Sequence, residues 1–153
     1  MNLQRELKKR DPFKDAKHEA MLSILKTSDL LANRVARTLR NYNLTMSQYN
    51  VLRILRGEAK PLPTIEVASR MIQVAPAITR VVEQLSHKKL VTRKQSADDG
   101  RVFLIELTTA GVKLLKKMDR PVDQIHEDTM KGLSEKELKS LSRMLFRLRD
   151  AIP

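Results

Sequence analysis

Cysteine and tryptophan are absent from the 153-residue sequence, and phenylalanine and tyrosine occur only three and two times. A chain without cysteine has no disulfide framework, no thiolate metal site and no thiol redox sensor. With aromatic residues at 3% of the sequence, stacking platforms for single-stranded RNA are scarce.

Glycine and histidine are also rare, with four glycines and three histidines spread widely along the chain. No two glycines are close enough for a Gly-rich phosphate-binding loop, and no histidine pair has metal-ligand spacing, so neither a cofactor nor a metal is expected. The longest uninterrupted apolar run is 102–105, which excludes a membrane-spanning helix, and residues 1–10 lack the apolar segment of a secretory signal. We therefore expect a cytoplasmic protein that does not enter the membrane.

Positive charge is abundant: 30 Lys and Arg against 18 Asp and Glu give a net charge of +12. The excess is distributed over the whole length and forms no detachable basic tail, so it belongs to folded surface. Such a surface favours a polyanionic partner, with nucleic acid first and an anionic membrane surface second.

Apolar residues recur at steps of three and four along most of the chain. Four threonines and serines are placed as N-caps: Thr45 in a capping box with Gln48, Thr64, Thr108, and Ser134 in a second capping box. Gly57 fits just past a helix end, and Pro121 is expected to kink or split its helix. The pattern predicts helices over about 14–40, 46–56, 65–71 and 76–87, a helix that starts near residue 109 and includes Ile125, and a last helix over about 135–152.

The period changes to two in residues 90–95 and 102–107, and Asp99-Gly100 lies between these runs, as is typical of a β-hairpin. Two short helices joined by a tight turn and followed by a hairpin describe a winged helix-turn-helix. The second helix of the pair carries Arg80 on its outward arc, where a guanidinium can donate to both guanine O6 and N7. On its own, Arg80 is better explained as a solvated surface residue, and the neighbouring hairpin is what favours the base-reading interpretation.

The hairpin tip holds a second notable pair, because Arg101 follows Asp99 by two residues across a glycine. A carboxylate there can hold the guanidinium extended, and an extended arginine suits the strongly negative potential of a narrow minor groove. The alternative is an ordinary surface turn with a local ion pair. Because the hairpin comes directly after the second helix, the minor-groove interpretation of Arg101 is favoured.

Five ordered motifs between residues 44 and 111 resemble the MarR (multiple antibiotic resistance) regulators. They correspond to the family signals LTxxQxxVL, TRxxxxL, LVxR, DxR and LTxxG, and the residues that carry them are Leu44-Thr45, Gln48, Val51-Leu52, Thr79-Arg80, Leu85, Leu90-Val91, Arg93, Asp99, Arg101, Leu107-Thr108 and Gly111. The resemblance implies a mainly α fold with a small β-hairpin wing. Its expected parts are an N-terminal dimerisation helix (1–44), a winged helix-turn-helix lobe (45–111) and C-terminal dimerisation helices (112–153).

The resemblance further implies a homodimer that binds a pseudo-palindromic duplex DNA operator. The recognition helix would contribute Ala75, Pro76, Ala77, Thr79 and Arg80. The wing and phosphate contacts would come from Lys88, Lys89, Arg93, Lys94 and Arg101, with Asp99 orienting Arg101. The dimer interface would include Ile24, Leu31, Leu138, Leu141, Leu145 and Leu148, since long terminal helices have too little of their own chain to cover them.

One departure from the family concerns Lys89, which stands where these proteins usually have glycine. A left-handed lysine costs roughly 1 kcal/mol relative to glycine. The alternative is an altered turn from which Lys89 contacts phosphate.

The function expected from the sequence is a DNA-binding transcriptional repressor without enzymatic activity. Many relatives release DNA when a small aromatic or phenolic anion binds, but a regulator without any effector is equally compatible with this sequence. A different hypothesis is a basic winged helix that binds RNA or a protein and has no DNA operator. An enzyme would have to use Asp98 and Asp99, the only two adjacent aspartates, which lie on an exposed turn without a nearby histidine.

Overall fold

The computed structural model describes residues 3–58, 60–73 and 77–153. The helices are α1 (Leu3–Glu6), α2 (Ala16–Arg40), α3 (Met46–Glu58), α4 (Thr64–Ser69), α5 (Ile78–His87), α6 (Thr109–Met130) and α7 (Glu135–Asp150). The strands are β1 (Leu62–Pro63), β2 (Val91–Gln95) and β3 (Phe103–Leu107). The fold class predicted from the sequence, mainly α with a small β wing, is confirmed.

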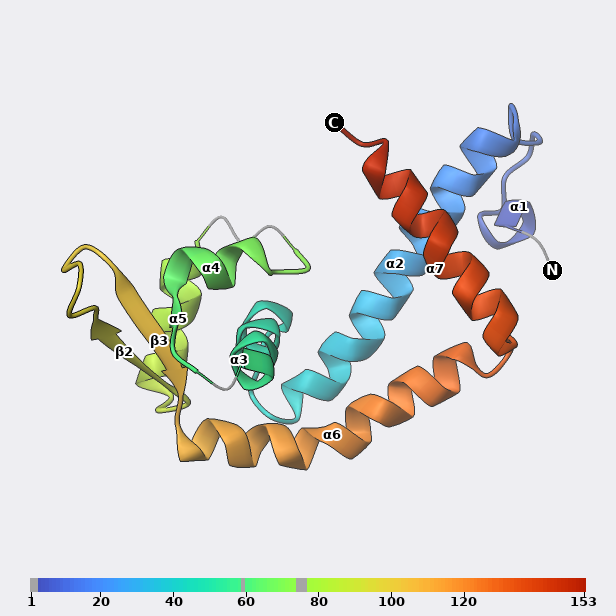
Figure 1. Cartoon of the computed structure of the whole chain (residues 1–153). Helices are drawn as coiled ribbons and strands as arrows, with labels where there is room; N and C mark the ends of the chain where they lie inside the picture. Colours follow the sequence, from blue (N-terminus) through green and yellow to red (C-terminus); the bar gives the residue numbers. More distant parts are fainter. Residues whose placement is uncertain (1–2, 59, 74–76) are drawn as a thin grey trace.

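The chain is elongated, with a winged lobe at one end and the chain termini at the other (Figure 1). The winged lobe consists of α3, α4, α5 and the sheet, and the N-terminal half of α6 runs beneath it. The rest of α6 leads away to α7, which crosses the N-terminal half of α2 in this view and is far from the lobe. None of the described helices is both long enough and apolar enough to cross a membrane.

The winged lobe is built around one apolar core. Its buried side chains come from every element of the lobe, from the C-terminal end of α2 and from α6; they are Leu39, Leu44, Val51, Leu52, Leu55, Leu62, Val67, Val82, Leu85, Leu90, Val91, Ile105, Leu115 and Met118. On the helices, these positions follow the three- and four-residue spacing of the sequence. The helical period therefore marked the core of the lobe correctly.

The sheet has three antiparallel strands in the order β1-β3-β2. Arg93 pairs with Ile105 and Gln95 with Phe103, so the hairpin lies within one residue of its predicted position. The two-residue strand β1, with Leu62 opposite Ile105, was not foreseen. Prolines on both sides of Leu62 indicated only a connection, and a proline is tolerated in an edge strand, where its missing N–H has no ladder partner.

The capping predictions hold at three of four positions. Thr45 and Gln48 form a reciprocal capping box, with Gln48 N–H to Thr45 Oγ1 at 3.2 Å and Thr45 N–H to Gln48 Oε1 at 3.3 Å. Ser134 and Thr108 cap α7 and α6. The assignment of Thr64 was wrong, because Pro63 is the N-cap of α4 and the Thr64 hydroxyl donates across to the Phe103 carbonyl on β3 at 3.3 Å.

Two other helix predictions need correction. Gly57 lies inside α3, which continues to Glu58. Pro121 does not split α6, which is continuous from Thr109 to Met130 and curves in Figure 1. Pro121 has no N–H for the carbonyl of Lys117 one turn earlier, and the Tyr42 hydroxyl lies 3.5 Å from that oxygen as a substitute donor.

Candidate nucleic-acid interface

The helix α5 presents a polar face to solvent on the outside of the winged lobe. Val82 and Leu85 are buried beneath it, whereas Thr79 and Arg80 are exposed, as is Ala77 at the N-cap. No side chain caps the first turn of α5, which leaves its N–H groups open to an external acceptor. The predicted contact residues Ala75 and Pro76 lie outside the described residues.

A buried glutamine fixes α5 against α3. Gln48 is 3% exposed, and its Nε2 donates to Gln84 Oε1 on α5 at 2.9 Å. Its Oε1 accepts from Lys88 Nζ at 3.0 Å in addition to the capping N–H of Thr45. From the sequence only the local capping role of Gln48 is predictable, because its partners, on α5 and at the C-cap of α5, lie 36 and 40 residues away and no short motif connects them.

Lys88 is therefore oriented differently from the prediction of a phosphate contact. Its Nζ donates to the Asn43 carbonyl as well as to Gln48, which directs the ammonium toward the turn between α2 and α3. Its charge supports the packing of α5 on α3.

Lys89 adopts the left-handed conformation, with φ of 58°. This confirms the strained interpretation and excludes the altered turn. Thr108, the N-cap of α6, holds this segment in place with two hydrogen bonds. Its Oγ1 donates to the Lys89 carbonyl at 2.8 Å, and its N–H donates to the Leu90 carbonyl at 3.1 Å. Gly111 completes this junction: a Cβ there would lie 2.3 Å from the Leu90 carbonyl oxygen, so only glycine lets α6 approach the base of the wing.

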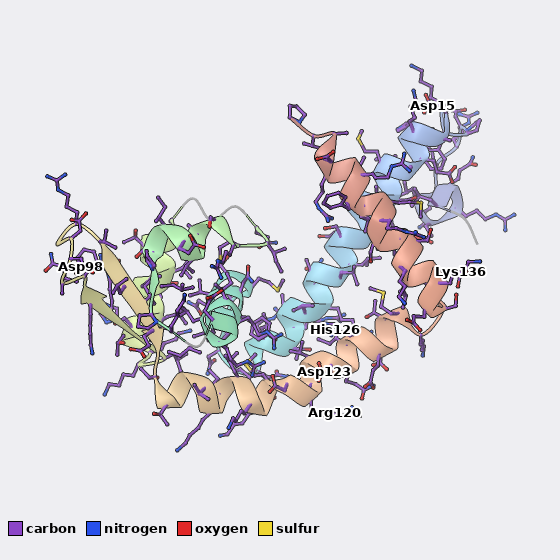
Figure 2. All side chains as sticks on the ribbon, viewed as in Figure 1. Asp15, Asp98, Arg120, Asp123, His126 and Lys136 are labelled. Carbon is purple, nitrogen blue, oxygen red and sulfur yellow. The ribbon has the colours of Figure 1, made fainter. Side chains whose placement is uncertain are left out.

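The hairpin tip carries Arg101 far from the core, at the end of the molecule where Figure 2 labels Asp98. The sequence suggested that the Asp99 carboxylate holds the guanidinium of Arg101, and this prediction was wrong. The carboxylate accepts the backbone N–H of Arg101 at 2.9 Å, and the Asp99 carbonyl accepts from Val102 N–H at 2.9 Å. Asp99 thus shapes the turn, and the exposed guanidinium of Arg101 extends from it without an ion pair to any described carboxylate.

The two basic residues of β2 lie on opposite faces of the hairpin, because strand side chains alternate. Arg93 shares the inner face with Ile105; its guanidinium stacks 3.7 Å from the centre of the Phe103 ring, and its Nη1 lies 4.0 Å from Glu83 Oε1 on α5. Lys94 is exposed on the outer face.

The predicted dimer residues differ in exposure. Leu31, Leu138, Leu141 and Leu145 are half-buried, while Ile24 and Leu148 are 37% and 44% exposed. The helix α7 has no fully buried residue although its apolar side chains recur with helical period. Met21, Leu25, Leu30, Met144 and Phe146 add further exposed apolar surface to α2 and α7.

A cavity of about 300 Å³ lies where α2, α3 and α6 meet below the helix-turn-helix. Its polar lining includes Tyr49, Arg53, Asp119, Asp123 and His126. Burial raises the pKa of the Tyr49 hydroxyl. No group of three potential metal ligands occurs within the described ranges, so the cavity has no metal centre among them.

An ion pair beside this cavity ties the winged lobe to α6. Arg56 donates to both carboxylate oxygens of Asp119, at 3.1 and 2.7 Å, and Arg53 lies 3.8 Å from the same carboxylate. The hydrogen bonds from Arg56 hold the pKa of the Asp119 carboxyl below its ordinary value of 3.8.

A scan against protein-family models matches residues 35–118 to the transcriptional regulator SarA/Rot family, which is more than half of the chain. The HTH-type transcriptional repressor IacR of Pseudomonas putida is 28% identical over 109 residues, 71% of this chain; the chain spans only 65% of that protein's length.

Solved structures extend the likeness over most of the chain. A MarR transcription factor from Planctomyces limnophilus is 34% identical with a TM-score of 0.69, over 88% of this chain and 98% of its own. The fold also matches MepR of S. aureus in a MepR-DNA complex, with a TM-score of 0.79 and 22% identity, over 86% of this chain and 97% of that one.

Proposed function

The chain belongs to the MarR and SarA/Rot group of DNA-binding transcriptional regulators, and from this premise we propose that it binds a pseudo-palindromic duplex operator as a homodimer. The observation that carries the proposal is the juxtaposition of the exposed polar face of α5 with a hairpin whose tip presents an arginine guanidinium that pairs with no described carboxylate. A helix of this kind enters the major groove, and an extended arginine enters the neighbouring minor groove.

The side chains divide into base-reading and phosphate-binding groups. Thr79 and Arg80 face the base edges, and Ala77, at the N-cap of α5, approaches the sugar-phosphate backbone. Ala75 and Pro76, which lie outside the described residues, are proposed as further contacts. Lys89 and Lys94 contact phosphates, and Arg101 occupies the minor groove. Lys88 contributes by fixing α5 through Gln48, and Asp99 by shaping the turn that presents Arg101.

The basic groups near the interface do not all contribute equally to DNA attraction. Arg70 is surrounded by carboxylates, with Glu66 at 2.7 Å and Glu58 in hydrogen-bond contact, so its charge is largely compensated. Since phosphate binding releases counterions, the exposed lysines and arginines give affinity that falls steeply with salt and carries no sequence information.

The homodimer follows from the terminal helices α2 and α7. Their exposed apolar side chains cover two helix faces that the chain leaves unburied, which a second copy with the same surface would bury. Two winged lobes then lie on the same side of the DNA, one for each half-site.

Repression is the proposed sign of regulation, because a dimer seated across an operator blocks access to the promoter and because the relative from Pseudomonas putida is a repressor. The cavity between the lobe and the terminal helices is the proposed place for an effector, and a ligand there would change the angle between them. A cytoplasmic location and the absence of enzymatic activity complete the proposal; Asp98 and Asp99 serve the hairpin turn, where Asp98 N–H donates to Ser96 Oγ at 3.3 Å.

The test is selection of genomic DNA fragments by the purified protein, followed by mobility shifts on the selected duplex. The proposal predicts that unlabelled operator displaces the probe at far lower concentration than structured RNA or scrambled duplex of equal length. Equal competition by structured RNA, or failure to select any duplex, would favour the RNA- or protein-binding module instead.

A further inference from the structure

Glu83 is the single acidic residue of α5, and it lies on the exposed face that is proposed to approach DNA. A carboxylate at this place repels phosphates and weakens binding to every duplex. A carboxylate on a base-reading helix can accept from a cytosine amine, but the structure also gives Glu83 a partner within the protein.

That partner is Arg93 on β2. Glu83 Oε1 and Arg93 Nη1 are 4.0 Å apart, and the two side chains are 52% and 31% exposed. The pair connects α5 with the inner face of the hairpin. At this distance the two groups attract one another but form no hydrogen bond.

The guanidinium of Arg93 is held in place by stacking rather than by hydrogen bonds. Its Cζ lies over the Phe103 ring, 3.7 Å from the ring centre, and the guanidinium donates no hydrogen bond to any described residue. A planar cation fixed in this way keeps its N–H donors available for a phosphate, and little conformational entropy is lost when one binds.

We infer that Glu83 and Arg93 form an exchange pair that sets DNA specificity, an inference that rests on the proposed function. In the free protein Glu83 compensates the charge of Arg93. On the operator, a phosphate placed between α5 and the wing takes over the guanidinium. On other sequences the lobe is seated less closely and no phosphate reaches Arg93, so the repulsion between Glu83 and the DNA backbone is not offset by a contact between Arg93 and a phosphate.

The test is a double-mutant cycle of the full-length protein with the variants Glu83→Gln, Arg93→Ala and both together. Affinities are measured for the selected operator and for a scrambled duplex of equal length, over a range of salt concentrations. Glu106→Gln is the matched control, because Glu106 is an exposed carboxylate on the outer face of the same hairpin, with Thr92 as its cross-strand neighbour.

We expect Glu83→Gln to strengthen binding to scrambled duplex by about tenfold and to the operator by about threefold or less, so that the specificity ratio falls. Arg93→Ala lowers the salt dependence of operator binding by about one phosphate contact per subunit. In the Arg93→Ala background the effect of Glu83→Gln on specificity disappears, whereas Glu106→Gln changes both duplexes by the same factor.

Equal effects of Glu83→Gln in both backgrounds would overturn the exchange pair and leave only long-range repulsion. If Arg93→Ala prevents folding, Arg93→Lys replaces it in the cycle, since lysine keeps the charge and loses the planar stack on Phe103; an unchanged specificity ratio in Arg93→Lys would equally contradict the inference. If the unmodified protein binds no duplex, the proposed function itself fails. If it discriminates the operator but the cycle is additive, only the exchange pair fails.

Discussion

The winged lobe and the terminal helices use the same apolar periodicity with opposite results. In the lobe, periodic side chains from every helix reach one buried core, from Leu39 through Met118. In α7 none is fully buried, and Phe146 is 63% exposed. The lobe therefore buries its apolar core within one chain, whereas the terminal helices leave apolar side chains exposed to solvent.

This difference in burial indicates that the lobe and the terminal helices have separate roles. A lobe with a complete core can hold α5 and the hairpin in a fixed relation without a partner, through contacts such as Gln48 to Gln84. Terminal helices with exposed apolar faces place two such lobes relative to one another once a second copy covers them. The following substitutions test the roles of the lobe and of the terminal helices separately.

The largest effect is expected for Phe146→Glu on α7. Phe146 would lie against the second subunit, and placing a charge there raises the dimer dissociation constant by at least about 100-fold, or about 2.7 kcal/mol. Sedimentation velocity measures it. Ile65→Glu on α4 is the control, because Ile65 is more exposed, at 80%, but belongs to the winged lobe. Equal dissociation of both variants would contradict the assignment of the interface to the terminal helices.

Gly111→Ala attacks the lobe instead. The new Cβ would meet the Leu90 carbonyl oxygen at 2.3 Å, and backbone cannot yield as a flexible side chain does, so we expect a loss of about 3 kcal/mol in the free energy of unfolding. Gly57→Ala and Gly132→Ala have no atom within 4 Å of the new Cβ and serve as controls. Urea denaturation gives the three values; a loss no larger for Gly111 than for the controls would contradict the tight junction.

Arg101→Ala tests the lobe without disturbing its core. Operator binding should weaken by about 1–3 kcal/mol, because the minor-groove contact is lost, while the dimer and its thermal stability stay the same. Mobility shifts and differential scanning calorimetry measure the two properties. Full affinity in a folded, dimeric variant would rule out the role of the wing arginine.

The smallest effect concerns the ion pair that joins the lobe to α6. Because Arg56 lowers the pKa of Asp119 in the folded state, this pair stabilises the fold above the ordinary pKa of 3.8, and its contribution is lost as the pH falls through the lower folded value. Both side chains are partly exposed, so we expect about 1 kcal/mol or less. The stability difference between the unmodified protein and Asp119→Asn, measured by urea denaturation, should be present at pH 7 and shrink below about pH 4. A difference that does not depend on pH would contradict this account.

The sequence was sufficient for most local features and insufficient for most contacts between distant elements. Capping boxes, the hairpin and the buried helix faces follow from spacings of two to four residues, and the structure has them where the spacing predicts. The positions of Lys88 and Arg93 depend on Gln48, Glu83 and Phe103, which no local pattern connects to them. For the same reason Asp99 was paired with the side chain of Arg101, although in the structure it accepts the backbone N–H.

The central claim is that two copies of this lobe are positioned on one duplex by the terminal helices. A hydroxyl-radical footprint of the full-length protein on its selected fragment tests that claim most directly. The account predicts two protected half-sites related by a two-fold axis, with centres about one helical turn apart, roughly 34–36 Å. A single asymmetric protected stretch, or protection without two-fold symmetry, would contradict it.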